Sequence, residues 1–187
     1  MPYIEGGSLD QRLEREHQLS LDQALGITHD VADALGYAHG LGILHRDVKP
    51  ENVLIGNTRA LIADFGLARA VGVANYRKLT DTGIMVGTLY YISPEQLLGE
   101  RDLDQRADIY SLGCLLYEML TGEPPYAGRV AHQLVTRIFR TPVPSARRLR
   151  VTVPETVDEA LGRALAKSAA DRFTSMAEFA AALPSQG

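Results

Sequence analysis

The chain has 187 residues, 45% of them hydrophobic and 22% charged, which is typical of one globular domain with a sizeable core. A formal net charge of −4 gives no electrostatic footprint for nucleic acid or for an anionic membrane surface, so we expect neither as a partner. The single cysteine, Cys114, excludes an intramolecular disulfide and suits a reducing compartment. Because no apolar run is long enough to span a bilayer and the first residues lack a signal-peptide pattern, the sequence predicts a cytoplasmic protein.

The first clear element is a long amphipathic helix that begins after Ser20. Ser20 and Gln23 match the pattern of a capping box, and apolar residues then recur at helical spacing. It is expected to end near Gly40 and Gly42, which can supply the left-handed geometry that ends a helix. Two histidines, His29 and His39, fall on this helix, but no Cys, His or carboxylate lies at a metal-site spacing from them. We therefore assign them no role and interpret them as surface or packing residues.

The helix leads to the stretch around which the chain is organised, H-R-D-V-K-P-E-N at residues 45–52. Two apolar runs of the kind found in strands follow at 53–55 and 61–63, separated by Gly56-Asn57. They predict a short β-hairpin. The triplet D-F-G at residues 64–66 comes directly after the second run.

These two motifs carry the charges that phosphoryl transfer requires. The reaction needs a carboxylate to accept the proton of the attacking hydroxyl, a carboxylate and an amide to hold Mg²⁺, and a cation near the moving phosphate. Asp47, Asp64, Asn52 and Lys49 provide this set. Each signal alone has a simpler explanation, since a single Asp before a strand is most often a turn former and a single D-F-G is common by chance. Their order and spacing together point to one site. The chain resembles a protein kinase, with H-R-D-x-x-x-x-N and D-F-G as that family has them.

The resemblance assigns a role to each charged residue. It implies that Asp47 is the catalytic base and that Asn52 and Asp64 hold Mg²⁺. Lys49, in the form D-x-K-P-E-N, resembles the serine/threonine branch, in which this lysine meets the transferred phosphate and the substrate hydroxyl. The resemblance therefore implies ATP and Mg²⁺ as cofactors, a protein substrate, and serine or threonine rather than tyrosine as acceptor.

The same resemblance implies an adenine site near the start of the chain. Residues 1–4 resemble the hinge between the two lobes of a kinase, where the carbonyl of Pro2 and the amide of Ile4 would face adenine. Leu54 is expected among the ATP-binding residues. The alternative for the first residues is an N-terminal segment with no fixed structure.

Residues 64–95 resemble the family's activation segment. Ser93-Pro94-Glu95 stands where Ala-Pro-Glu is usual, which is a chemically small departure. Thr88 resembles the threonine whose hydroxyl bridges the catalytic aspartate and lysine. We expect Arg46 to be a buried cation, for which a phosphothreonine at Thr80 or Thr82 is the natural partner. The alternative is that these two threonines are ordinary loop residues.

The second half of the chain is expected to be a helical scaffold. Residues 104–122 form an apolar pattern on nearly all sides, which predicts a buried central helix. Asp108 within it matches the family's carboxylate that holds the backbone of the catalytic loop. Further helices are expected over 130–140 and after residue 154. In D-R-F, Arg172 resembles the arginine that pairs with the activation-segment glutamate, here Glu95.

No G-x-G-x-x-G and no V-A-I-K-type lysine precede the catalytic loop in this sequence. We therefore expect a mainly α fold with a short β-hairpin region: a protein-kinase-like C-terminal lobe (8–187) after a hinge remnant (1–7), without the β-rich N-terminal lobe. Such a chain should by itself be weakly active or inactive. Two alternatives remain: a non-catalytic interaction module, or one half of a split kinase whose N-terminal lobe is supplied by another chain.

Overall fold

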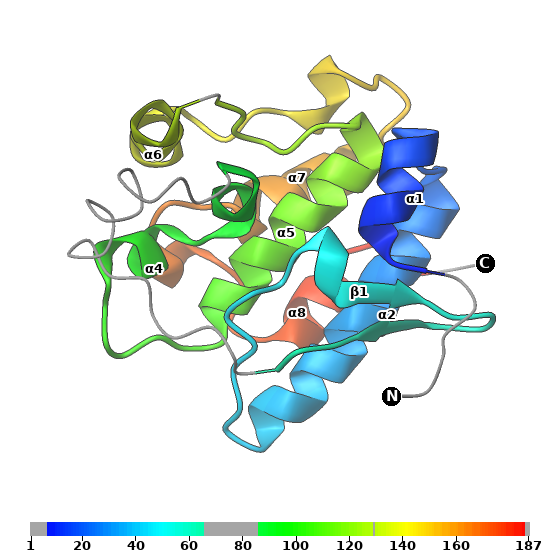
Figure 1. Cartoon of the computed structure of the whole chain (residues 1–187), viewed down its shortest axis with the longest axis horizontal. Helices are drawn as coiled ribbons and strands as arrows, with labels where there is room; N and C mark the ends of the chain where they lie inside the picture. Colours follow the sequence, from blue (N-terminus) through cyan, green and yellow to red (C-terminus); the bar gives the residue numbers. More distant parts are fainter. Residues whose placement is uncertain (1–6, 66–85, 129, 186–187) are drawn as a thin grey trace.

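The structure, a computed structural model, describes residues 7–65, 86–128 and 130–185 and consists mainly of helices (Figure 1). A pair of short strands forms a two-stranded antiparallel sheet. This confirms the predicted mainly α fold with a short hairpin. None of the described helices is long and apolar enough to cross a membrane. The described elements are, in order, α1 (Leu9–Glu16), α2 (Leu21–Gly40), the 3-10 helix η1 (Pro50–Asn52), β1 (Val53–Ile55), β2 (Ala60–Ile62), the 3-10 helix η2 (Val86–Tyr91), α4 (Pro94–Leu98), α5 (Arg106–Thr121), α6 (Ala131–Arg140), the 3-10 helix η3 (Ala146–Arg148), α7 (Glu155–Ala164), the 3-10 helix η4 (Ala169–Asp171) and α8 (Met176–Ala181).

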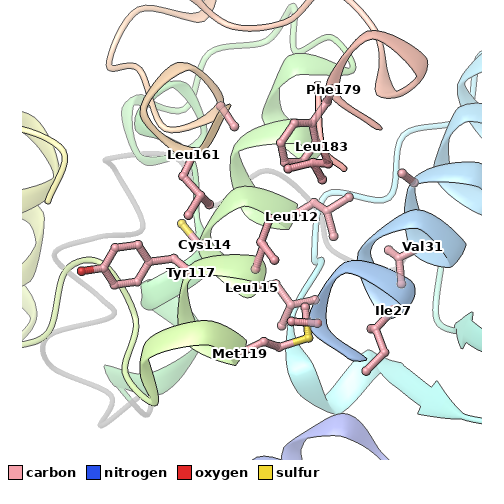
Figure 2. Packing of buried hydrophobic residues seen from close by; sticks show 14 of the residues in the cluster. Ile27, Val31, Leu112, Cys114, Leu115, Tyr117, Met119, Leu161, Phe179 and Leu183 are labelled. Carbon is pink, nitrogen blue, oxygen red and sulfur yellow. The ribbon is translucent and has the colours of Figure 1, made fainter. Parts of the chain in front are cut away.

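Helix α5 is the centre of the core, as its apolar pattern predicts. It runs through the middle of the molecule with α2, α7 and α8 around it (Figure 1). All but two of its 16 residues are buried, and Cys114 among them is fully inaccessible. Figure 2 shows side chains of α5, such as Leu115 and Met119, packed against Ile27 and Val31 of α2. Burial of this kind is the main favourable contribution to folding.

Helix α7 approaches α5 closely because α5 has a glycine at the contact. A Cβ atom added at Gly113 would lie 3.1 Å from the Cβ of Ala164. The absence of a side chain at Gly113 therefore sets the distance between the two helices. The glycine that follows α5, Gly122, has φ +85°, a left-handed conformation that ends the helix.

Helix α2 precedes the motif at residues 45–52 and leads directly into it. Its capping box is formed as predicted: the Ser20 hydroxyl accepts the Gln23 N–H, and the Gln23 side-chain oxygen accepts the Ser20 N–H, each at 3.2 Å. Gly42, just beyond the helix, has φ +75° and turns the chain back.

The hairpin differs by one residue from the prediction. The first strand is Val53–Ile55 as expected, but the second is Ala60–Ile62 rather than 61–63. The turn explains the shift, because the Gly56 N–H donates to the Arg59 carbonyl at 3.0 Å and Ala60 already pairs with Ile55. The other edge of β1 is hydrogen-bonded to the segment before α1, where the Ile55 N–H donates to the Gly7 carbonyl at 2.9 Å.

A second group of apolar side chains lies away from the main core and joins η2 and α4 to α6. We call it the α6 cluster; its buried members are Leu89, Leu97, Tyr126, Leu134 and Ile138. Because it includes residues of η2 and α4, this cluster supports the C-terminal end of the segment predicted to be the activation segment.

Candidate active site

The backbone of residues 45–52, the predicted catalytic loop, is held by a buried carboxylate. Asp108, in the first turn of α5, has no exposed surface, and its two oxygens accept the N–H groups of His45 at 2.9 Å and Arg46 at 2.8 Å. The contact predicted for Asp108 is thus present. Without such partners a buried carboxylate would be costly.

His39 completes this arrangement, and sequence reasoning missed it. Its Nε2 lies 2.7 Å from Oδ2 of Asp108, and the two side chains are 3% and 1% exposed. No metal-site spacing connects His39 to a partner, because Asp108 lies 69 residues away in the sequence. One signal was available: His39 falls four residues after the buried Leu35, on the apolar stripe of α2.

His45 connects the catalytic loop to the segment that leads into D-F-G. Its Nε2 lies 2.8 Å from the Ala63 carbonyl, and its Nδ1 accepts the Asp47 N–H at 3.2 Å. Since Nδ1 acts as an acceptor, Nε2 carries the hydrogen and donates a hydrogen bond to the Ala63 carbonyl. The ring of Phe65 packs against the imidazole with a centroid distance of 4.7 Å. Asp64 therefore lies between two residues that both contact His45.

Three of the predicted catalytic side chains meet on one loop. The Lys49 ammonium lies 2.8 Å from Oδ2 of Asp47. The Asn52 amide donates to the Asp47 carbonyl at 2.8 Å and to Oδ2 at 3.2 Å. The Asp47 side chain is 28% exposed, so its carboxylate is fixed by two neighbours and still accessible to a second molecule.

The residues expected to hold Mg²⁺ offer suitable donor atoms. Because the Asn52 amide nitrogen is engaged with Asp47, the side-chain oxygen of Asn52 remains available as a ligand. Asp64 is exposed, and the Ala63 N–H before it donates to the Asn52 carbonyl at 2.9 Å, which brings the two segments together. Mg²⁺ prefers such oxygen ligands and needs only one or two from the protein beside phosphates and water. Within the described ranges no group of three or more His, Cys, Asp or Glu side chains forms a metal site of another kind.

The predicted pairing of Arg172 with Glu95 is present and buried. The guanidinium nitrogens lie 2.6 and 2.8 Å from the two carboxylate oxygens, and the residues are 1% and 9% exposed. Arg172 also donates to the carbonyls of Ala166 at 2.8 Å and Arg106 at 3.0 Å. This bidentate pair fixes α4 to the loop that follows α7.

The expectation that Arg46 is a buried cation is wrong. The residue is exposed, and the fold uses its backbone instead: the N–H donates to Asp108 and the carbonyl accepts from Gln96 Nε2 at 2.8 Å. These two contacts hold Arg46 at φ +67°, an uncommon conformation for a residue with a side chain. That a phosphothreonine at Thr80 or Thr82 meets Arg46 stays a prediction, because both threonines lie outside the described residues.

Other predicted site residues are only partly covered by the structure. Pro2 and Ile4 lie outside the described residues. The backbone of Thr88 belongs to η2, but its side chain is not among the described atoms. Leu54 is half-buried on β1 and forms a β-bridge with Ser8, so it lies beside the chain that follows the expected hinge.

A carboxylate with a strongly altered pKa lies between α5 and the end of η2. Glu118 accepts a hydrogen bond from the Tyr91 hydroxyl at 2.6 Å. Burial raises the pKa of Glu118 to about 7; the Tyr91 hydrogen bond opposes this shift, and the negative charge of Glu51 adds to it. Glu118 is therefore partly protonated at neutral pH. The helical periodicity of the sequence does not predict this burial of Glu118 or its contact with Tyr91.

Comparison with known proteins agrees with this geometry. The protein kinase domain family matches residues 1–182 of the chain. "Serine/threonine-protein kinase PknB" of Mycobacterium leprae is 40% identical over 188 residues, covering 98% of this chain and 29% of the relative. The protein of the same name from Mycolicibacterium smegmatis is 41% identical with the same coverage. "Serine/threonine-protein kinase PknH" of Mycobacterium bovis is 39% identical over 183 residues, covering 97% of this chain and 30% of the relative. The chain thus spans about three tenths of the length of these relatives. It belongs to the protein kinase family.

Proposed function

We propose that this chain is the catalytic lobe of a serine/threonine protein kinase, which transfers a phosphoryl group from ATP to serine or threonine hydroxyls of a protein substrate with the help of Mg²⁺. The observation that carries the proposal is the group formed by Asp47, Lys49 and Asn52 on a loop whose backbone is held by Asp108. The names of the relatives support the choice of serine or threonine as acceptor.

In this proposal each residue of the loop acts through a defined atom. Oδ2 of Asp47 is occupied by Lys49 and Asn52, so Oδ1 is the oxygen that accepts the proton of the substrate hydroxyl. The Lys49 ammonium offsets the negative charge of the transferred group. The side-chain oxygens of Asn52 and Asp64 would hold Mg²⁺, which when bound neutralises charge on the phosphates.

The 187 residues contain no glycine-rich phosphate loop and no V-A-I-K-type lysine. We therefore propose that the chain assayed by itself binds ATP weakly and transfers phosphate slowly or not at all. A split enzyme, in which a second chain supplies these parts, is compatible with this proposal. A purely non-catalytic interaction module is disfavoured, because binding alone has no physical need for the paired Asp47 and Lys49.

Phosphate incorporation into a mixture of serine-, threonine- and tyrosine-containing peptides tests the proposal. The chain is assayed with labelled ATP and Mg²⁺, alone and with a separately produced nucleotide-covering lobe of a protein kinase. We expect incorporation into serine and threonine only, increased by the added lobe. Asp47→Asn should lower the rate about 100-fold or more, the usual contribution of a general base. Asp102→Asn, the same change at an exposed position, is the control. Equal rates for the two variants would contradict the assignment of Asp47.

A further inference from the structure

Gln96, in the first turn of α4, connects that helix to the loop that carries Asp47. Gln96 is only 4% exposed. Its side-chain oxygen accepts the N–H of Ser93 at 3.1 Å and the hydroxyl of Ser93 at 2.9 Å. Because a backbone N–H can only donate, this contact fixes the orientation of the amide group. Nε2 of Gln96 is thereby turned toward the Arg46 carbonyl, to which it donates at 2.8 Å.

The hydrogen bond from Gln96 acts on the peptide group directly before Asp47. The oxygen of that group is the Arg46 carbonyl, which accepts from Gln96, and its nitrogen is the Asp47 N–H. This N–H donates to Nδ1 of His45 at 3.2 Å. The preceding peptide group is held as well, because the Arg46 N–H donates to Oδ1 of Asp108 at 2.8 Å. Of these three contacts, the one from Gln96 is the one that comes from α4.

Arg46 depends on such contacts because its backbone lies in the left-handed region. Its φ of +67° is unfavourable for a residue with a Cβ atom, and conformations of this kind persist where the surrounding structure holds them in place. Without the hydrogen bond from Gln96, the peptide group before Asp47 can rotate toward a more common conformation. Such a rotation displaces the Asp47 carboxylate.

Helix α4 is itself fixed where the predicted activation segment ends. Glu95, the neighbour of Gln96, forms the buried pair with Arg172. Leu97, the neighbour on the other side, belongs to the α6 cluster together with Leu89 of η2. The position of Gln96 therefore follows the position of the C-terminal end of that segment.

We propose that Gln96 is a positioning residue for phosphoryl transfer: its amide holds the backbone before Asp47 and couples this carboxylate to the end of the predicted activation segment. This role rests on the proposed function, in which Asp47 accepts the proton of the substrate hydroxyl. Gln96 acts through the Arg46 carbonyl. A displacement of about 1 Å at a reacting group can lower a rate on the order of 100-fold, so a single hydrogen bond at this place has a measurable effect.

Amide hydrogen exchange tests the contact without any requirement for activity. Gln96→Met has a side chain of similar length and no N–H donor. In this variant the Arg46 and Asp47 amides should exchange about five-fold faster, the factor that corresponds to one hydrogen bond. Gln18→Met is the matched control, because Gln18 Nε2 donates to the Thr121 carbonyl, also at 2.8 Å. If the two loop amides exchange at the wild-type rate in Gln96→Met, the proposal is overturned.

Gln96→Glu separates this coupling from the folding of α4. Glutamate can keep the capping box with Ser93, but its other oxygen faces the Arg46 carbonyl and cannot donate while ionised. Circular dichroism should therefore show the wild-type helix content. At pH 8 we expect kcat to fall about 10- to 100-fold, with the KM for ATP changed by less than about two-fold.

The pH profile of Gln96→Glu distinguishes positioning from a merely structural role. As the pH falls from 8 to 6, the buried carboxyl takes up a proton and can again donate to the Arg46 carbonyl. Its rate relative to wild type should then rise, and the ratio removes the contribution of Glu118 and of other titrating groups that both proteins share. A ratio that stays constant over this range would show that the missing donor does not cause the loss.

The rates are measured with the separately produced nucleotide-covering lobe, beside Asp47→Asn and Gln18→Met. If Asp47→Asn is impaired while Gln96→Glu equals wild type at pH 8, the proposed function stands and the positioning role is refuted. If the wild-type chain with the added lobe transfers no phosphate to serine or threonine, the proposed function fails and the catalytic role of Gln96 fails with it. Hydrogen exchange then still decides whether Gln96 holds the backbone of the loop.

Discussion

Nε2 of His39 lies 2.7 Å from Oδ2 of Asp108, and this buried contact joins the end of α2 to the start of α5 directly beneath the catalytic loop. The same carboxylate accepts the backbone N–H groups of His45 and Arg46. One side chain on each of two core helices thereby fixes the loop that carries Asp47. The position of the proposed base depends on packing between helices that are distant in sequence.

We expect His39→Ala to lower the free energy of unfolding by about 2–3 kcal/mol, because it removes a hydrogen bond to a buried carboxylate and leaves that oxygen short of a partner. Urea unfolding monitored by circular dichroism measures the change. His132→Ala removes an exposed histidine and should change stability by less than about 0.5 kcal/mol. If both variants unfold at the wild-type urea concentration, the contact does not stabilise the fold.

Arg172→Ala should destabilise the domain by about 3–5 kcal/mol, because it leaves Glu95 buried without its cation. Arg59→Ala serves as the comparison, since the Arg59 side chain is 64% exposed in its pairs with Asp30 and Asp33 and its loss should cost no more than about 1 kcal/mol. Thermal and urea unfolding of the two variants under the same conditions measure the difference. Similar losses of unfolding free energy for both variants would show that the buried pair stabilises the fold no more than the exposed one.

The raised pKa of Glu118 predicts a pH dependence of stability with a definite sign. Because the folded state favours the protonated carboxyl, Glu118 contributes most below its ordinary pKa of 4.5, and this contribution is lost as the pH rises to about 7. The loss is on the order of 3 kcal/mol, from 1.36 kcal/mol per pKa unit. Glu118→Gln cannot ionise, so the difference in unfolding free energy between wild type and variant should change between pH 4.5 and 7.5. A constant difference over that range would exclude the shift.

Tyr91→Phe gives an independent check of the same carboxyl group. The Tyr91 hydroxyl donates to Glu118 and lowers its pKa, so its removal should raise the pKa of Glu118 further. The pH-dependent loss of stability in Tyr91→Phe should extend to higher pH than in wild type. An unchanged pH profile would show that the hydroxyl does not act on Glu118.

Gly113→Ala should destabilise the core by about 1–3 kcal/mol, the usual cost of overpacking, because the added methyl group meets Ala164 on α7. The matched control lies on α7 itself: a Cβ at Gly162 has no atom within 4 Å, so Gly162→Ala should stabilise the helix by about 0.5–1 kcal/mol. Urea unfolding should therefore separate the two variants in opposite directions. A stabilising Gly113→Ala would show that the contact between α5 and α7 can relax.

Features that depend on neighbouring residues were predictable from the amino-acid sequence. The capping box of Ser20 and Gln23 was predictable because its partners lie within one helical turn. The set formed by Asp47, Lys49 and Asn52 was predictable because it lies within a single motif of six residues. The pairing of Arg172 with Glu95 and the contact of Asp108 with the loop came from the family resemblance, since no local pattern connects residues so far apart.

Which polar groups are buried, and which residues they contact, became clear from the folded chain. Arg46 was expected to be buried, but the fold uses its backbone and leaves the side chain exposed. His39 and Lys167 contact partners that lie 69 and 41 residues away in the sequence, Asp108 and Tyr126. Desolvation and pairing depend on the packing of whole helices, and a residue's own neighbours in the sequence do not specify that packing. The catalytic residue types of the loop at 45–52 can therefore be predicted from the local sequence, whereas the electrostatic environment of that loop depends on the folded chain.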